Sequence, residues 1–144
     1  SDPHNVGAII RSAAAFGCAG VLIPTHNTAA VTGAVAKASA GMLFAVPIVN
    51  IGNENQTILD LKKRGFWSYG LAGQGERSVH KEIFDAPAVF VIGNEAEGLR
   101  EKTREHCDFV LQIPMHPRCE SLNASVSAAV ALSSWSRQHG EALK

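Results

Sequence analysis

The sequence predicts an α/β protein with a mainly parallel sheet and helices on both faces. Short apolar runs alternate with helical patterns along the 144-residue chain, as in βαβ units. Two of these runs, residues 20–24 and 88–92, are continuously apolar, which is typical of buried parallel strands. The length suits one core and is too short for two ordinary domains, so we expect a single domain over residues 1–144.

The elements follow from hydrophobic periodicity and from the residues that end each pattern. In order, we expect a helix over 5–16, a strand over 20–24, a helix over 29–40, a strand over 46–51, a helix over 56–64, a strand over 66–72, a strand over 88–92, a helix over 98–107, a strand over 109–113 and a helix over 121–138. Residues 78–84 are ambiguous.

The first helix places one arginine opposite its apolar stripe. On a helical wheel Arg11 lies beside His4, Gly7 and Ala15. Small neighbours let a ligand approach the backbone, so we expect Arg11 to border a pocket. The alternative is an ordinary solvent-exposed arginine.

The last helix, 121–138, is apolar or small nearly all round. Alanines and serines separate its large residues Leu122, Val126, Leu132 and Trp135. A small domain cannot bury every side of such a helix by itself. We therefore expect one face to pack on the sheet and the other to pack on a second subunit.

Composition narrows the classes of function. Hydrophobic residues make up 46% and charged residues 18% of the chain, and the net charge is zero with His neutral. Overall charge therefore gives no support to nucleic-acid binding, although a local patch could supply the contacts. The three widely spaced cysteines suit a reducing compartment. With no transmembrane-length apolar run and no signal peptide pattern, we expect a cytoplasmic protein.

Three glycine-containing or polar loops follow predicted strands, at residues 71–76, 93–98 and 114–121. Loops at the carboxyl ends of parallel strands converge on one crevice, so we expect a ligand pocket there. The sequence lacks the G-x-G-x-x-G, P-loop and G-x-S-x-G motifs. His116 and Cys119 form one isolated pair without a second pair at metal-binding spacing, so we expect no metal site.

The stretch 113–127, IPMHPRCESLNASVS, is the most informative. Pro114 stops the strand, and we expect Glu120, Ser121 and Asn123 to occupy the first turn of the last helix, where side-chain oxygens cap free N–H groups. A merely well-capped helix is the alternative. Ser121 has no recognisable His partner, so a hydrogen-bonding role is favoured over a nucleophilic one. Glu95 follows a strand end and is either a site residue or a helix cap.

Three stretches in series resemble the SpoU/TrmH family of RNA ribose 2′-O-methyltransferases, within the SPOUT class. They are DPHNVGAIIRSAAAFG at 2–17, IGNEAEGL at 92–99 and the stretch 113–127. The resemblance spans the whole chain. Residues 37–47 and 104–108 look most like the branch that methylates a guanosine of 23S ribosomal RNA.

The resemblance implies S-adenosylmethionine bound in a trefoil knot of the C-terminal part, a homodimer through helix 121–138, and an RNA substrate, either rRNA or tRNA. It implies that the active site holds Asn5, Arg11, Glu95, Ser121 and Asn123. The implied cofactor residues, largely through backbone groups, are Leu71, Ala72, Gly73, Ile92, Gly93, Asn94, Gly98, Ile113, Met115, Ser121, Leu122 and Ala124.

Two departures from the family pattern affect these expectations. Pro117 replaces a usual Gly in the loop that meets the cofactor, and proline removes an N–H and fixes φ. The chain is also expected to lack the strand that usually precedes the first motif and any RNA-binding extension. Two alternatives stay open: a non-catalytic dimeric module that binds RNA or a nucleotide, and an ordinary nucleotide-binding α/β enzyme.

Overall fold

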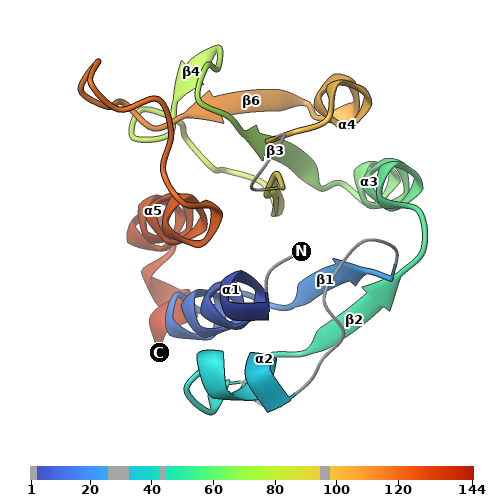
Figure 1. Ribbon diagram of the computed structural model, residues 1–144. Helices are drawn as coiled ribbons and strands as arrows, with labels where there is room; N and C mark the ends of the chain where they lie inside the picture. The colour runs from blue at the N-terminus through green and yellow to red at the C-terminus, as the bar shows by residue number, and fades with distance from the viewer. Residues whose placement is uncertain (1–2, 26–32, 43–44, 95–97) are drawn as a thin grey trace.

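The fold is an alternation of short helices and strands, as the sequence predicts (Figure 1). The computed structural model describes residues 3–25, 33–42, 45–94 and 98–144. Its elements are α1 (Pro3–Ala15), β1 (Val21–Pro24), α2 (Gly33–Ala38), β2 (Ile48–Ile51), α3 (Glu54–Lys63), β3 (Trp67–Leu71), β4 (Arg77–Ser78), β5 (Ala88–Val91), α4 (Glu101–His106), β6 (Phe109–Gln112), α5 (Ala124–Gln138) and a final 3₁₀ turn, η2 (Gly140–Leu143).

The strands pair in parallel, but the described residues form two sheets instead of one. β1 pairs with β2 alone, and the second sheet has the order β4-β6-β3-β5. The expectation that the strand over 20–24 is buried in a parallel sheet is therefore correct for Ile23, which is buried, and wrong for Leu22. Leu22 is 37% exposed and Val49 on β2 is 48% exposed, because a two-stranded sheet presents one face to solvent.

In the larger sheet, β6 lies between β3 and β4, although β3 and β4 are consecutive in the chain. The connection from β3 to β4 therefore crosses the carboxyl end of β6, where Ala72 N–H donates to Leu111 C=O and Glu76 N–H to Val110 C=O. The trefoil knot implied by the family resemblance stays a prediction, although this strand order is compatible with a threaded chain.

Helices cover both faces of this sheet, as predicted. On one face, Tyr69, Leu71 and Leu111 pack with Phe84 and with Ala131 of α5. The other face lies toward α4, since a methyl group at Gly70 would meet Leu99 and Cys107 side chains.

A second, smaller core lies where α1 packs between α2 and α5 (Figure 1). Ile10, Val35 and Val46 are its buried residues. Gly7 is buried against α2: a Cβ built on it would lie 2.5 Å from Ala38 Cβ and 2.7 Å from the Val35 carbonyl oxygen. The prediction that Gly7 opens the backbone to a ligand is therefore wrong, because this glycine admits a neighbouring helix.

Replacing Gly7 with alanine is expected to destabilise the chain by about 1–3 kcal/mol, the usual cost of overpacking a close contact. The neighbouring atoms include backbone, which cannot rotate away. The matched control is Gly33→Ala at the start of α2, where nothing lies within 4 Å of the new methyl group. Urea unfolding should show the control at or above the parent's stability; equal midpoints for both variants would contradict this account of the helix contact.

Several predicted boundaries shift. The last helix begins at Ala124, so Glu120 and Ser121 lie in the preceding extended segment and not in its first turn. Helix α4 begins at Glu101 instead of residue 98. The ambiguous residues 78–84 supply the end of β4 and then a turn.

Within the described ranges, no helix combines the length and apolar character needed to cross a membrane.

Candidate active site

The loops after β3 and β6 lie together at the carboxyl edge of the larger sheet, as the sequence predicts. A Cβ on Gly73, in the first loop, would lie 3.2 Å from the carbonyl oxygen of Glu120, in the last loop. The loop after β5 begins at the same edge, because β3 and β5 are parallel neighbours. The backbone N–H and C=O groups of these loops that are not already bonded within the chain can therefore serve one ligand at this edge.

The turn at residues 73–75 is held from two sides. Gly75 N–H donates to Gln112 Oε1 at 3.2 Å, and Arg104 Nη2 of α4 donates to the Gln74 carbonyl at 2.8 Å. A Cβ on Gly75 would lie 2.7 Å from Val110 O, so the turn sits directly against β6. Sequence reasoning assigned no role to Arg104 or Gln112, although Arg104 falls in the stretch that carries part of the family likeness.

Two hydrogen bonds join the two ends of the loop after β5. Asn94 N–H donates to Gly98 C=O at 3.0 Å, and Gly98 N–H returns a bond to Asn94 C=O at 2.7 Å. Gly98 has φ +64°, and a Cβ on Gly93 would lie 2.4 Å from the carbonyl carbon of Gly98. The close contact thus requires glycine at Gly93, and the positive φ favours it at Gly98. Glu95, a predicted catalytic residue, lies outside the described residues.

Pro117 fits the loop after β6. Cys119 N–H donates to His116 C=O at 3.0 Å, so residues 116–119 form a β-turn with Pro117 at its second position. Proline's fixed φ suits that position, where the turn uses no N–H from the second residue. Arg118 adds two bonds at 3.1 Å, from its backbone N–H and its Nε–H to His116 Nδ1. Pro117, in place of the family's usual glycine, therefore makes this turn more rigid.

Asn123 is the N-cap of α5. Its Oδ1 accepts from Ser125 N–H at 2.9 Å and Val126 N–H at 3.3 Å. The predicted capping role is confirmed for Asn123 alone, because Ser121 lies outside the helix. Ser121 and Leu122 are exposed on the segment leading to the helix. The cap holds Asn123's oxygen against the helix and leaves its NH₂ group as the donor for a ligand.

Within the described ranges, no hydrogen bond or ion pair links Arg11 to these loops. Arg11 is exposed on α1 and makes no hydrogen bond or ion pair within the described residues, whereas Asn5, two turns earlier on the helix, is half-buried. On the wheel Arg11 borders the face that carries Ala8 and Ser12, and these two residues line a groove against α5. The four described residues of the predicted catalytic set thus divide, with Asn5 and Arg11 on α1 and Ser121 and Asn123 between β6 and α5.

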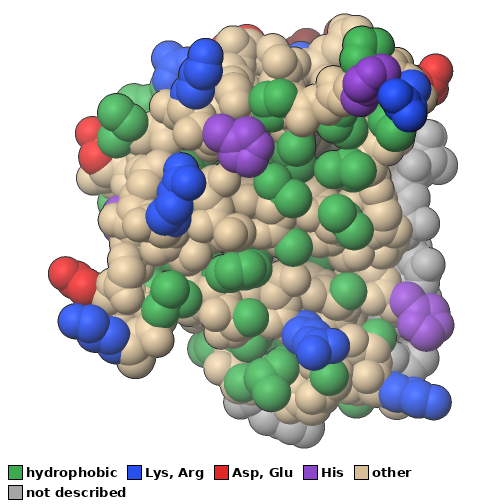
Figure 2. All heavy atoms as spheres, turned by 90° about the vertical axis from the view of Figure 1, so that its left-hand side faces the viewer, with side chains coloured by type: hydrophobic (Ala, Val, Ile, Leu, Met, Phe, Trp, Pro, Cys, Tyr) green, Lys and Arg blue, Asp and Glu red, His purple; other side chains and the backbone are tan. Residues whose placement is uncertain are grey.

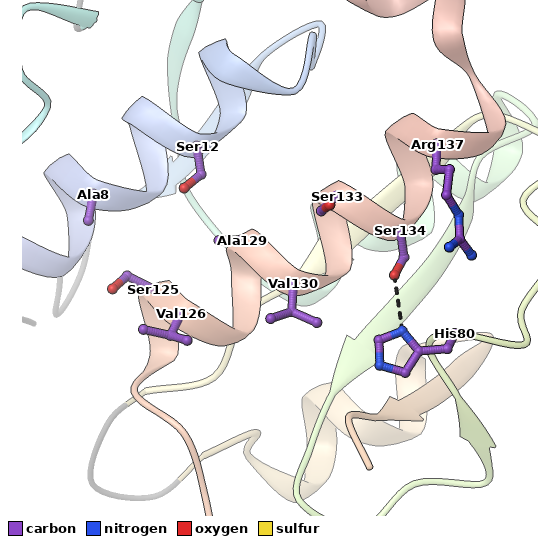
Figure 3. Close-up of a pocket in the computed structure, with 10 residues that line it drawn as sticks. All are labelled: Ala8, Ser12, His80, Ser125, Val126, Ala129, Val130, Ser133, Ser134 and Arg137. Carbon is purple, nitrogen blue, oxygen red and sulfur yellow. Dashed lines mark hydrogen bonds between the residues drawn. The ribbon is translucent and has the colours of Figure 1, made fainter. Parts of the chain in front are cut away.

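The groove between α1 and α5 has a volume of about 570 Å³ (Figure 3). Small residues make part of its walls, Ala8 and Ser12 from α1 and Ser125, Ala129 and Ser133 from α5, and larger residues of α5 make the rest, Val126, Val130 and Arg137. His80 closes one end, with Nδ1 3.4 Å from Ser134 Oγ. No motif marked His80 in the sequence.

Asp108, directly before β6, links the start of that strand to β3. Its Oδ2 accepts from Ser68 N–H at 2.8 Å and Ser68 Oγ at 3.1 Å, and Lys62 Nζ lies 3.0 Å from Oδ1. Burial alone would raise the pKa of Asp108, but the bonds from Ser68 and Lys62 outweigh it and the pKa is lowered. In the neighbouring residue, burial raises the pKa of the Cys107 thiol to about 11, and the negative charges of Glu54 and Asp108 act in the same direction. That thiol is therefore a poor nucleophile.

Replacing Asp108 with asparagine is expected to lower stability at pH 7 by about 1.5–3 kcal/mol, the usual contribution of a hydrogen bond to a charged group. Because the folded-state pKa is below the unfolded value, this stabilisation is complete above about pH 4 and disappears as pH falls through the folded pKa. Urea unfolding from pH 3 to 7 should therefore show parent and variant converging at low pH. A constant difference in unfolding free energy across that range would refute the ionic contribution. The control is Asp85→Asn, at an exposed residue.

Comparison with known proteins completes the description. The family model described as the SpoU rRNA Methylase family matches residues 1–133. The chain is 47% identical over 131 residues to the 23S rRNA (guanosine-2′-O-)-methyltransferase RlmB of Xanthomonas axonopodis pv. citri, covering 91% of this chain and 53% of that protein. The chain therefore spans about half the length of such curated relatives.

Solved structures have the same fold. The SpoU methyltransferase AviRb from Streptomyces viridochromogenes, in complex with the cofactor AdoMet, superposes with a TM-score of 0.89 at 30% identity, over 98% of this chain and 58% of that one. The TrmH/SpoU tRNA modifying enzyme of A. aeolicus superposes with a TM-score of 0.86 at 28% identity, over 98% of this chain and 72% of that one.

Proposed function

The chain belongs to the SpoU rRNA Methylase family, and on that premise we propose that it transfers a methyl group from S-adenosylmethionine to a ribose 2′-hydroxyl of RNA. The observation that supports this most directly is the meeting of the loops after β3 and β6 at one sheet edge, with the Asn123 cap beside them. The likeness to RlmB favours a guanosine of 23S rRNA as the target.

The described residues fit the cofactor. At this edge, tight glycine turns bring backbone polar groups to the surface, and a methyl on Gly93 would collide with the backbone of its own loop. Such turns suit an adenosine ligand held mainly by main-chain bonds. The residues proposed to hold it are those of the three loops: Leu71, Ala72, Gly73, Ile92, Gly93, Asn94, Gly98, Ile113, Met115, Ser121, Leu122 and Ala124.

The bound cofactor supplies a methyl group already activated by a sulfonium. The protein must then place the ribose oxygen in line with it and favour loss of the hydroxyl proton. A guanidinium presents a positive charge and a planar pair of N–H donors, so the proposed role of Arg11 is to clamp a phosphate and stabilise the developing alkoxide. Asn5, Glu95, Ser121 and Asn123 are proposed to orient Arg11 and the ribose through hydrogen bonds.

Calorimetric titration and a transfer assay test this function together. The chain should bind S-adenosylmethionine and should not bind NAD or ATP comparably. With undermethylated ribosomal RNA it should release S-adenosylhomocysteine, and mass spectrometry of RNA digests should find a 2′-O-methylnucleoside. Binding of NAD or ATP in preference would support an ordinary nucleotide-binding enzyme. Cofactor or RNA binding with no transfer to any RNA would support the non-catalytic module.

A homodimer through α5 is part of the proposal. The face that carries α5 gathers hydrophobic side chains across its middle (Figure 2), and Leu122 and Val126 near the start of α5 are 37% and 47% exposed. The small-walled groove between α1 and α5 lets a second helix approach closely. Arg11 borders this groove on α1. Dimerisation through the groove would therefore also bring the loops of a second chain toward Arg11.

Val126→Arg is expected to shift the protein from dimer to monomer and to reduce methyl transfer in parallel. A charge at the centre of an apolar interface is left unpaired on association, whereas on the exposed surface of a monomer it costs little. Val49→Arg on β2 is the matched control, because Val49 is 48% exposed. Sedimentation equilibrium at one protein concentration should show a monomer for Val126→Arg only; a dimer in both variants would place the interface elsewhere.

A further inference from the structure

A half-exposed tryptophan lies where the strands of the larger sheet begin, at the end opposite the candidate active site. Trp67 opens β3 and is 45% exposed, and its ring lies parallel to that of Phe109, which opens β6, with centroids 5.4 Å apart and planes within 3°. Since β3 and β6 are parallel, both rings stand at the amino ends of their strands. The loops of the candidate active site leave the carboxyl ends, about 17 Å away for a five-residue strand at about 3.3 Å per residue.

This aromatic pair is fixed in position by its neighbours. The Arg77 guanidinium lies over the Phe109 ring, 4.1 Å from its centroid. Glu82 holds that guanidinium with two oxygens at 2.9 and 3.3 Å, and the Glu82 side chain is only 8% exposed. The indole is therefore ordered before any ligand arrives, and binding to it costs little conformational entropy.

A groove of about 330 Å³ runs beside the rings. Ile83, 72% exposed, adds an aliphatic surface to the aromatic one, while Lys81 and Asp85 supply a cation and a hydrogen-bond acceptor. The groove thus combines a flat aromatic ring, a positive charge and a carboxylate within one small space. The centres of protein–protein interfaces are depleted in charged residues, so this mixture favours a smaller polar and aromatic ligand.

Ion pairs inside the protein account for part of the charge near the groove. Asp108 is paired with Lys62, and Glu82 is paired with Arg77. Of the other charged residues, Lys81 and Asp85 line the groove, exposed Lys63 and Arg64 at the end of α3 precede β3, and exposed Glu105 lies on α4 ahead of β6. The groove therefore offers the cation of Lys81, and the segment that leads to Trp67 carries two further cations that can attract phosphate.

We propose that this groove, the Trp67 groove, binds an unpaired nucleotide of the RNA at a distance from the methylated ribose. The base stacks on Trp67, Asp85 accepts a base N–H, and Lys81 with the α3 cations attracts the neighbouring phosphates. Stacking on an aromatic ring with cations along the backbone is how proteins hold single-stranded RNA. The inference rests on the proposed function only in taking RNA as the ligand.

The site acts on binding and not on the chemical step, because it is remote from the reacting sugar. An interaction that is equal in ground state and transition state raises KM when it is lost and leaves kcat unchanged. Trp67→Leu should therefore raise the KM for RNA at unchanged kcat, whereas loss of a catalytic group lowers kcat.

The direct test uses the indole itself. The chain has two tryptophans, so a Trp135→Phe background leaves Trp67 as the sole indole. Titration with a short single-stranded oligoribonucleotide should quench its fluorescence, with an apparent affinity that falls as salt rises. No quenching at concentrations where anisotropy of the labelled oligonucleotide shows binding would overturn the proposal.

Variants separate stacking from simple apolar contact. By anisotropy, Trp67→Phe should keep most of the RNA affinity, and Trp67→Leu should lose roughly 5- to 150-fold, the range for base–aromatic stacking. Leu143→Ala, at a 54% exposed residue of η2, is the control. Equal affinity of the Phe and Leu variants, or binding of a protein partner at this groove in place of RNA, would overturn the inference. Thermal unfolding of each variant excludes misfolding.

The outcomes also separate this inference from the proposed function. Fluorescence quenching requires no methyl donor, so quenching without any methyl transfer would remove the proposed function and keep the groove. Methyl transfer with an unchanged KM in Trp67→Leu would keep the function and remove the groove.

Discussion

Arg11→Ala is expected to reduce methyl transfer at least about 100-fold, the cost typical of removing one preorganised charge-stabilising group. Cofactor affinity should change little, because Arg11 is exposed on α1 and the candidate cofactor loops leave the sheet edge. The loss should lie in kcat at saturating cofactor. Calorimetry with S-adenosylmethionine and single-turnover transfer to RNA measure the two quantities separately.

Two controls define the meaning of this result. Arg11→Lys keeps the charge but loses the planar two-pronged donor, so partial activity would indicate a charge role and full loss a geometric one. If Arg11→Ala lost cofactor binding and transfer in equal proportion, the assignment of Arg11 to the RNA side would fail. If it retained parental kcat, Arg11 would be an ordinary surface arginine.

Gly93→Ala is expected to weaken cofactor binding about tenfold or more, because the strain of a backbone collision reaches about 1–3 kcal/mol and each 1.4 kcal/mol is tenfold. The new methyl group would lie 2.4 Å from the Gly98 carbonyl carbon and 2.6 Å from Leu99 N. The paired bonds between Asn94 and Gly98 would have to open to accommodate it. Calorimetry should show the higher Kd for S-adenosylmethionine.

Gly52→Ala provides the matched control for this prediction, since no atom lies within 4 Å of its added methyl group. That variant should bind the cofactor as the parent does. Because Gly93→Ala could also lower global stability, thermal unfolding must accompany the titration. An unchanged Kd in a folded Gly93→Ala variant would remove the loop after β5 from the cofactor site.

Much of the candidate site follows from local sequence. Pro114 ends a strand, Asn123 caps a helix and Gly98 adopts a positive φ, and each of these is a short-range property that one residue type imposes on its own segment. The convergence of two loops was also predictable, because parallel strands place their carboxyl ends at one edge. Helix boundaries were less accurate: the sequence pattern could not distinguish the extended residues before Asn123 from a first helical turn.

Gly7 shows where a local pattern is insufficient. Its position beside Arg11 suggested an open pocket, yet the space is occupied by α2, because a missing side chain admits a helix as readily as a ligand. The division of the strands into two sheets was also not predictable, since apolar runs in β1 and β5 look alike before their pairing is known.

The sequence by itself determined the α/β class, the order of the elements, the capped and glycine-bearing loops, and the family. These depend on periodicity, propensity and motif, which act over a few residues. Only the tertiary structure decided that Arg104 and Gln112 hold the turn at 73–75, that no hydrogen bond joins Arg11 to the described part of the loops, and that Trp67 stacks on Phe109 where β3 and β6 begin. Each of these is a contact between segments distant in the chain, fixed by strand order and helix packing, which no local pattern encodes.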